Sequence, residues 1–381
     1  MNNKHIKHIT AVTKVFPDGQ RCVRAELEYD HPLDPNVALD TFSVRERTIT
    51  AVHVDGNTVA LDLSPEDAAA RTFRPGNPWR HDLPTVVAAK VAVTQIKPIP
   101  AQDGSPVEPA GEDESDRVLN QVVDDFIQGE FEGLKYNLYI PKDMAEKEKY
   151  PLVQFIHDAG PCGPDPQFTL TQGVGAIVWG TPEFQDRHKC FVLAPQFDVP
   201  SIVDDEGHVD SRLDTLKRLL DHLCEKYPVD RTRLYTTGQS MGCMSSIVLN
   251  CRYPDLFAAS YLVAGQWSER DIPNLEKARL WMICSVGDAK AFPGMNQIAC
   301  ELESRGVRVA RKVIDARASQ DELTAATREL ISNGTSVIYT PFAMESVADG
   351  WHSRGGAHHV TTWQHAYGLE AAQEWLFAQH R

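Results

Sequence analysis

The sequence predicts two domains of different class, an all-β sandwich followed by a doubly wound, mostly parallel α/β sheet. The chain has 381 residues, which is long for a single domain. Short alternating patterns separated by turns fill the first hundred residues, whereas strand and helix patterns alternate from about residue 131. A Pro-, Gly- and acid-rich stretch lies between these regions. We therefore predict domains at 1–117 and 118–381, with this stretch as a linker at the end of the first.

The sandwich is predicted from apolar and polar residues that alternate with a period of two, the pattern of a strand with one buried face. The clearest hairpin signal is Asp55-Gly56-Asn57, which has alternating residues on both sides. Six strands are expected, at 8–15, 22–29, 42–44, 49–54, 59–63 and 86–96. Residues 97–117 are predicted to be a loop or tether because they are rich in Pro, Gly and acidic residues. A metal site is not expected there, since the spacing of the acidic residues lacks the Asx-Gly turn of a calcium loop. Since the histidines of this domain are dispersed, no catalytic set is expected in it.

The second domain is predicted from strands that alternate with helical patterns. Residues 151–157 are almost continuously apolar, as expected for a strand buried on both faces. Further strands are expected at 135–140, 191–194, 258–264, 279–286, 307–314 and 336–341 and just before residue 238, with helices at 214–226 and 361–380. In such sheets the site lies outside the carboxyl ends of the strands.

The motif Gly-Gln-Ser-Met-Gly at 238–242 follows an apolar run and precedes an amphipathic one, so it marks a sharp turn between a strand and a helix. Gly238 and Gly242 supply the space that this turn needs. The turn presents Ser240 at a helix N-terminus, where backbone N–H groups favour negative charge. The pattern therefore predicts Ser240 as a nucleophile.

A serine nucleophile needs an adjacent base, which is itself oriented by an acid, and in this architecture both follow the serine in the chain. His359 lies in a predicted loop between the last strand and the C-terminal helix, and the adjacent His358 is an alternative that periodicity alone leaves open. Asp288 follows the strand at 279–286 and is predicted to be the acid, with helix capping as its structural alternative. Asp315, at the next strand end, is the reserve candidate.

Backbone N–H donors are also required for the oxyanion of a tetrahedral intermediate. Met241 should supply one donor, and the loop at 157–160 should supply the other, from either Asp158 or Ala159. Several aromatic and polar residues near strand ends could line a substrate pocket, although core packing explains each of them nearly as well. These pocket candidates are His157, Trp179, Gln196, Gln239, Gln266, Trp267 and Trp351.

Composition restricts the partners. The net charge is −15 and no basic cluster occurs, so neither nucleic acid nor an anionic membrane surface is an expected partner. No apolar run approaches the roughly 18 residues of a membrane-spanning helix. The first residues lack a signal-peptide core, so the chain as given is expected to be cytoplasmic, and secretion from a longer precursor is compatible with this. Eight scattered cysteines without a C-x-x-C motif favour reduced thiols.

No cofactor and no metal are expected. Zinc binding by His352, His358 and His359 is disfavoured because their spacing contains no helical i, i+4 pair.

Several motifs together resemble those of one group of enzymes. They are Ile177-Val178-Trp179, Phe191-Val192-Leu193-Ala194-Pro195-Gln196, residues 235–242, residues 253–259, and Gly-x-x-His-x-x-Thr-Trp at 356–363. The sequence resembles bacterial carboxylesterases that carry an immunoglobulin-like domain ahead of an α/β-hydrolase domain, related to feruloyl-esterase and polyhydroxybutyrate-depolymerase-like enzymes. The motifs span most of 130–381, and the front domain matches more loosely.

The resemblance implies an esterase and places the base on His359, which matches the histidine of the C-terminal motif. It supports Asp288 less cleanly, because the usual spacing from Asp to Pro is off by one before Pro293. Cys243 stands where such proteins usually have another glycine. Relatives use the front domain for assembly and for shaping the site, so a homo-oligomer formed through that domain is expected.

The primary hypothesis is hydrolysis of small-molecule or polymer-derived carboxylic esters through an acyl-serine intermediate. A serine oligopeptidase of related fold is the first alternative, but the front domain is too short for the β-propeller that usually gates such enzymes. The second alternative is a non-catalytic binding protein with a degenerate hydrolase domain. The presence of candidate Ser, Asp and His residues argues against it.

Overall fold

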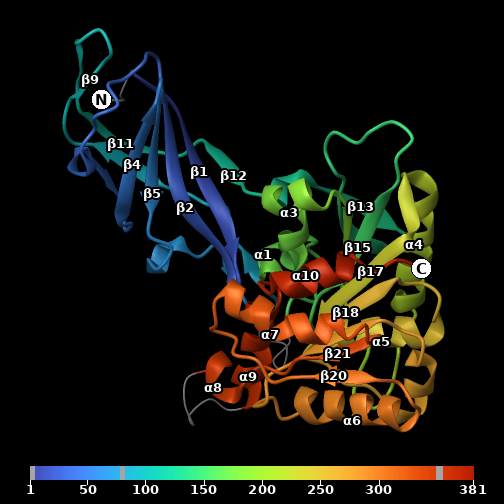
Figure 1. Cartoon of the computed structure of the whole chain (residues 1–381). Helices are drawn as coiled ribbons and strands as arrows, with labels where there is room; N and C mark the ends of the chain where they lie inside the picture. Colours follow the sequence, from blue (N-terminus) through green and yellow to red (C-terminus); the bar gives the residue numbers. More distant parts are fainter. Residues whose placement is uncertain (1–4, 78–81, 349–354) are drawn as a thin grey trace. The chain divides into compact units, whose positions relative to one another are not determined.

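The structure is a computed structural model that describes residues 5–77, 82–348 and 355–381. The chain forms two compact units, which are coloured along the sequence in Figure 1. The first unit comprises Met1–Arg74 and Thr85–Asp124, and the second comprises Pro75–Pro84 and Asp125–Arg381.

The first unit is the predicted sandwich. A five-stranded sheet has the order β12-β1-β2-β5-β4, and a three-stranded sheet has the order β11-β8-β3. Apolar side chains from both sheets form one core, for example Leu27 and Leu61 from the larger sheet and Phe42 and Val93 from the smaller. The strands are β1 (Ile6–Phe16), β2 (Gly19–Tyr29), β3 (Phe42–Val44), β4 (Ile49–Asp55), β5 (Thr58–Leu63), β8 (Ala92–Gln95), β11 (Ala110–Glu114) and β12 (Arg117–Asn120).

The prediction of a loop or tether at 97–117 is wrong. This stretch contains β9 (Ile99–Pro100), β10 (Pro106–Val107), β11 and the start of β12. β11 pairs with β8, and β12 pairs in parallel with β1, so the first unit continues past the predicted boundary at 117/118. Both β11 and β12 are edge strands, where one side of the strand needs no partner and charged side chains face water. An acidic composition is therefore compatible with strand pairing here.

The expected strand at 86–96 is interrupted in the structure. It consists of β7 (Thr85–Val86), which pairs with β6 (Phe73–Arg74), and of β8. The residues between β7 and β8 are outside any strand.

The second unit contains the predicted doubly wound sheet. Its nine strands have the order β13-β14-β16-β15-β17-β18-β19-β21-β20, and the strands from β15 to β21 run parallel to one another. β13 and β14 form an antiparallel edge. The strands are β13 (Phe126–Phe131), β14 (Leu134–Tyr139), β15 (Tyr150–Ile156), β16 (Phe191–Gln196), β17 (Val229–Gln239), β18 (Ala259–Val263), β19 (Leu280–Ile283), β20 (Val309–Arg311) and β21 (Val337–Tyr339).

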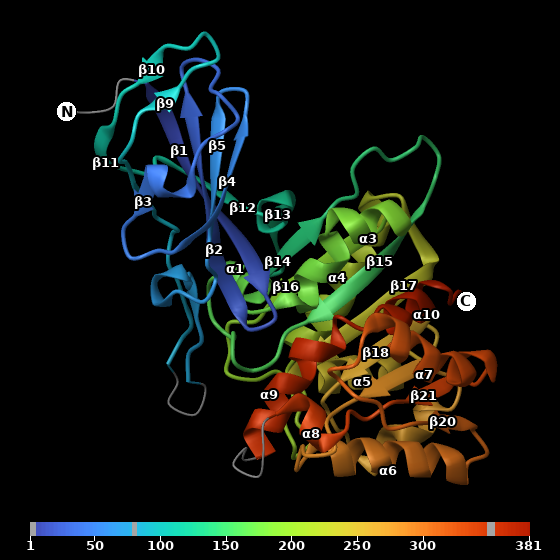
Figure 2. The ribbon, with the colours of Figure 1, turned by 60° about the vertical axis from the view of Figure 1, so that its left-hand side comes forward.

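Helices cover both faces of this sheet, as seen by comparing Figures 1 and 2. Crossovers between parallel strands are right-handed, so connections that run in opposite directions along the sheet lie on opposite faces. One group is α1 (Gln167–Thr171), α2 (Val174–Ile177), α3 (Pro182–Arg187) and α7 (Gln320–Ser332), with α10 (Glu370–Phe377) packed on α7. The other group is α4 (Arg212–Lys226), α5 (Met241–Arg252) and α6 (Ala291–Ser304).

The C-terminal region differs from the single helix expected at 361–380. It forms α9 (Gly355–Ala366) and α10, which are separated by a turn that includes Gly368, after a short α8 (Met344–Val347). Because α9 begins early, His359 lies on a helix and not in the predicted loop. Within the described ranges, no helix combines the length and apolar character needed to cross a membrane.

Candidate active site

The bend between β17 and α5 holds Ser240 in a strained conformation. Its φ of 53° and ψ of −118° lie outside the regions that residues with side chains usually adopt. A Cβ atom at Gly238 would lie 2.5 Å from the carbonyl carbon of Gly242, and one at Gly242 would lie 1.9 Å from the carbonyl oxygen of Ile156. Both positions therefore require glycine. The Ser240 N–H donates to the Val263 carbonyl oxygen at 3.0 Å, which ties the bend to the neighbouring strand β18.

The structure brings the three predicted catalytic residues together. His359 Nε2 lies 2.8 Å from Ser240 Oγ, and His359 Nδ1 lies 2.5 Å from Asp288 Oδ2. An ionised carboxylate only accepts hydrogen bonds, so Nδ1–H is the donor to Asp288 and Nε2 is left to accept from the serine hydroxyl. This order of contacts is that of a nucleophile, a base and an orienting acid.

Asp288 has two roles in this structure, one for each carboxylate oxygen. Oδ1 accepts from the N–H groups of Lys290 (3.0 Å) and Ala291 (2.9 Å) at the start of α6, while Oδ2 accepts from His359. Burial raises the pKa of Asp288, but the hydrogen bond and charge of His359, together with the two backbone donors, outweigh this effect. The pKa of Asp288 therefore lies below its ordinary value, and the side chain is a carboxylate at neutral pH.

The two alternative residues lie elsewhere. His358 is buried, its Nδ1 lies 3.2 Å from Ser285 Oγ, and its ring packs on Gly287, where a Cβ would come within 2.6 Å. Asp315 is exposed and accepts from the Arg317 N–H at 2.8 Å within its own turn. In the structure, the position next to Ser240 is therefore occupied by His359 and that next to His359 by Asp288.

The two predicted sources of oxyanion donors differ in how they are held. Met241 begins α5, and the first amides of a helix have no acceptor within the helix. In the loop after β15, Asp158 accepts from the Gly160 N–H and from Gln239 Nε2, each at 2.8 Å. The Gly160 N–H is thus already used, while the choice between the Asp158 and Ala159 N–H groups stays open.

His157 links the loop after β15 to Phe197 through two hydrogen bonds. It is fully buried, its Nε2 accepts from the Phe197 N–H at 3.1 Å, and its Nδ1–H donates to the Asp158 carbonyl oxygen at 2.6 Å. Burial lowers the pKa of His157, so the imidazole is neutral at neutral pH, as this pair of bonds requires. His157 therefore positions the loop after β15 and does not line an exposed pocket, as was predicted for it.

Three other pocket candidates, Trp179, Gln239 and Gln196, are buried in the structure. Trp179 is fully buried, donates to the Gly175 carbonyl oxygen at 2.8 Å and packs against Phe184 and Phe377. The structure therefore corrects the prediction of Trp179 as a pocket residue, because an aromatic side chain near a strand end packs equally well into the core. Gln239 is buried beneath the loop after β15, and Gln196 bonds to Thr169 within the core. Trp351 and His352 lie outside the described residues.

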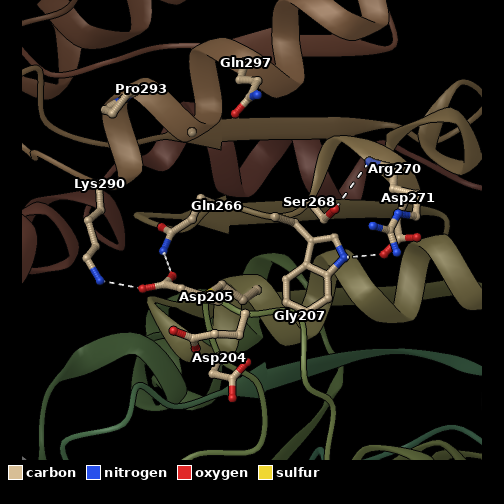
Figure 3. Close-up of a pocket in the computed structure, with 14 residues that line it drawn as sticks. Asp204, Asp205, Gly207, Gln266, Ser268, Arg270, Asp271, Lys290, Pro293 and Gln297 are labelled. Carbon is tan, nitrogen blue, oxygen red and sulfur yellow. Dashed lines mark hydrogen bonds and ion pairs between the residues drawn. The ribbon is translucent and has the colours of Figure 1, made fainter.

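Trp267 and Gln266 line a cavity of about 580 Å³ (Figure 3). This volume is in the range of small-molecule sites. The cavity adjoins the predicted catalytic residues, because its wall includes Met244, whose N–H donates to the Ser240 carbonyl oxygen, and Lys290, whose N–H donates to Asp288. The lining residues are Asp204, Asp205, Glu206, Gly207, Met244, Gln266, Trp267, Ser268, Arg270, Asp271, Lys290, Pro293, Gly294 and Gln297.

Sequence reasoning missed the charged part of this wall. The segment 204–207 follows β16, and Lys290 lies two residues after Asp288, so both come after the carboxyl ends of parallel strands. This position after a parallel strand is the sequence feature that could have predicted both segments as part of the site. No local motif identifies either segment.

Comparisons with known proteins agree with this architecture. Residues 8–108 match the family model of the esterase Ig-like N-terminal domain. The crystal structure of a thermostable esterase is 27% identical to this chain, with a TM-score of 0.83 over 99% of this chain and 100% of the other.

Two curated relatives match part of the chain. Feruloyl esterase B of Talaromyces stipitatus is 25% identical over 182 residues, which are 45% of this chain and 42% of that protein. Acetylxylan esterase A of Aspergillus awamori is 25% identical over 162 residues, which are 41% of this chain and 50% of that protein. The matches thus span half or less of each curated relative. Together with the match of the front domain, they support the resemblance to esterases that carry an Ig-like domain before an α/β-hydrolase domain.

Proposed function

We propose that this protein is a serine carboxylesterase that hydrolyses carboxylic esters through an acyl-serine intermediate. The observation that carries the proposal is the unbroken series of contacts from Ser240 Oγ to His359 Nε2 and from His359 Nδ1 to Asp288 Oδ2. The similarity to esterases gives independent support.

In the proposed reaction, the base and the nucleophile act in sequence. Ser240 Oγ attacks the ester carbonyl carbon while its proton passes to His359 Nε2, and the Asp288 carboxylate stabilises the resulting imidazolium. When the tetrahedral intermediate collapses, His359 returns the proton to the departing alkoxide and the acyl group stays on Ser240. A water molecule, deprotonated by His359, then attacks the acyl carbonyl carbon. When this second tetrahedral intermediate collapses, the bond to Ser240 Oγ breaks, His359 returns the proton to Ser240 Oγ, and the carboxylic acid is released.

Charge on the tetrahedral intermediate needs fixed donors. The Met241 N–H and one N–H of the loop after β15 are proposed to provide them, each worth about 10²–10³ in rate. This loop is held by buried contacts from His157 and from Gln239. Such preorganisation matters because donors that must reorient during the reaction lose most of their effect.

The proposal is tested by Ser240→Ala, with Ser246→Ala as the matched control. Ser246 is a buried serine on the same helix, and its hydroxyl contacts Thr236 Oγ1 at 3.0 Å. We expect Ser240→Ala to fold like the wild type by circular dichroism and to lose turnover of p-nitrophenyl acetate and butyrate, whereas Ser246→Ala stays active. Near-wild-type turnover by folded Ser240→Ala would overturn the proposal. Matched ester and amide substrates separate esterase from oligopeptidase activity.

A further inference from the structure

The cavity beside the catalytic residues has an unbalanced set of charges. Its wall contains four carboxylates, on Asp204, Asp205, Glu206 and Asp271. Among the described residues that line it, two are cations, Arg270 and Lys290, so the formal charge of this part of the wall is −2.

The Asp205 carboxylate lies between Lys290 and Gln266 (Figure 3). One carboxylate oxygen accepts from Lys290 Nζ at 2.5 Å, and the other accepts from Gln266 Nε2 at 2.5 Å. The hydrogen bond from Lys290 is the main reason that the pKa of Asp205 lies below its ordinary value, and the charge of His359 lowers it further. Asp205 is therefore a carboxylate at neutral pH.

These contacts leave the cavity negative. Lys290 forms an ion pair with Asp205, so its charge is offset by that carboxylate. Asp271 accepts from Trp267 Nε1 at 2.8 Å, a neutral donor, and among the described residues it forms no ion pair. An entering carboxylate or sulfonate would therefore meet like charge, whereas an ammonium group would meet opposite charge.

We propose that this cavity receives one end of the ester substrate and selects it by charge, so that the enzyme prefers esters with an ammonium group over neutral isosteres and discriminates against esters with an anionic group. This inference deepens the proposed function and rests on it. Asp205 and Lys290 are the specificity-determining pair, because the charge of each one masks that of the other.

The expected size of the charge preference, measured as a ratio of kcat/KM values, follows from Coulomb's law. A unit charge about 6 Å from another, at an effective dielectric constant of about 40, changes an interaction roughly tenfold. Because both partners of the pair are partly exposed, added salt should reduce the discrimination. A purely steric preference would not depend on salt in this way.

The test compares kcat/KM within two series of esters that differ only in charge. On the alcohol side, the substrates are the butyrate esters of choline, of its neutral isostere 3,3-dimethylbutanol and of isethionate. On the acyl side, they are the p-nitrophenyl esters of 4-(trimethylammonio)butyrate, 5,5-dimethylhexanoate and 4-sulfobutyrate. In at least one series we expect the order cationic, neutral, anionic, with about tenfold between the extremes or more at low salt. The series that shows this order identifies the end of the ester that enters the cavity.

Two substitutions should move the preference in opposite directions. Asp205→Asn exposes the charge of Lys290 and should lower the ratio of cationic to neutral turnover about tenfold. Lys290→Met exposes the charge of Asp205 and should raise that ratio. Asp186→Asn, which makes the same charge change at an exposed position outside the cavity, should leave the ratio unchanged. Using ratios cancels any general effect of the substitutions on His359.

The outcomes separate this inference from the proposed function. If neutral esters are hydrolysed but both series show no charge order, or if the two substitutions leave the ratios unchanged, the charge selection is refuted while the esterase proposal stands. If the folded protein hydrolyses none of the esters, the proposed function itself is refuted.

Discussion

Replacing Asp288 with asparagine keeps the shape of the side chain and reverses one hydrogen bond. In the wild type, Asp288 Oδ2 accepts from His359 Nδ1–H at 2.5 Å, which leaves Nε2 free to accept the proton of Ser240. In the Asp288→Asn variant, the amide oxygen can still accept from the Lys290 and Ala291 N–H groups at the start of α6. The amide nitrogen then faces His359 and donates to Nδ1, so the proton of the imidazole moves to Nε2.

The wrong tautomer cannot take the proton of the serine. In the serine protease template, the same change lowers kcat by about 10⁴, which corresponds to about 5 kcal/mol of transition-state stabilisation. We expect a loss of this order in Asp288→Asn. By contrast, the cap of α6 is retained, so the effect on folding should be small compared with Asp288→Ala, which also loses a cap worth about 1 kcal/mol.

The assay is kcat for p-nitrophenyl butyrate, measured together with the midpoint of thermal unfolding. Asp315→Asn is the matched control, because Asp315 is also found after a strand of the sheet but is exposed and bonds within its own turn. A folded Asp288→Asn enzyme with kcat within tenfold of the wild type would refute the reasoning. An equal loss in Asp315→Asn would also refute it.

Three further predictions concern stability and the identity of the base. The pKa of Asp288 is lowered in the folded state, so its carboxylate contributes fully to stability above the ordinary pKa of about 3.9. This contribution is lost as the pH falls through the folded-state pKa. The difference in unfolding midpoint between wild type and Asp288→Asn should therefore shrink below about pH 4. A difference that is independent of pH would contradict this. Gly242→Ala places a Cβ 1.9 Å from a backbone oxygen and should lower the free energy of unfolding in urea by about 3 kcal/mol or more. Gly356→Ala, where a Cβ meets no atom within 4 Å, should be neutral or slightly stabilising. Equal effects of the two substitutions would argue against a tight turn. His359→Gln should lower kcat by about 10⁴ or more, because it removes the base. His358→Gln should keep kcat within about tenfold of the wild type but lower the midpoint of thermal unfolding. The reverse result would assign the base to His358.

The parts of the site that could be predicted from the sequence are those set by local sterics and by topology. The bend at Ser240 needs glycine at Gly238 and Gly242 for reasons that involve only the adjacent strand and helix, so a five-residue motif is enough to predict it. The placement of Asp288 follows from the rule that parallel strands deliver functional residues at their carboxyl ends. Both inferences use information within a few residues of the side chain in question.

The choice between His358 and His359 is of another kind. Adjacent residues on a helix point about 100° apart, so only one of them can reach Ser240. Which one does so depends on how α9 rotates against the sheet, and His358 instead packs on Gly287 and contacts Ser285. Periodicity alone contains no information on this rotation, and the resemblance to a known motif was needed to select His359.

The errors come from long-range contacts that composition does not reveal. Edge strands β11 and β12 have the acidic character of a linker, and only their pairing with β8 and β1 makes them strands. The cavity wall combines residues that are far apart in the sequence, from the segments after β16, β18 and β19 and from helices α5 and α6. Without those contacts, Trp179 and Trp267 were equivalent candidates, although one is a core residue and the other lines the cavity.

The central claim is that Ser240 is activated by His359 and becomes acylated during turnover. A fluorophosphonate probe reacts with such a serine, so the most direct measurement is mass spectrometry of the intact, labelled protein followed by peptide mapping. We predict one adduct per chain, on the peptide that contains Ser240, and no adduct in Ser240→Ala. A folded wild-type protein that hydrolyses esters but stays unlabelled, or that is labelled at another residue, would contradict the account.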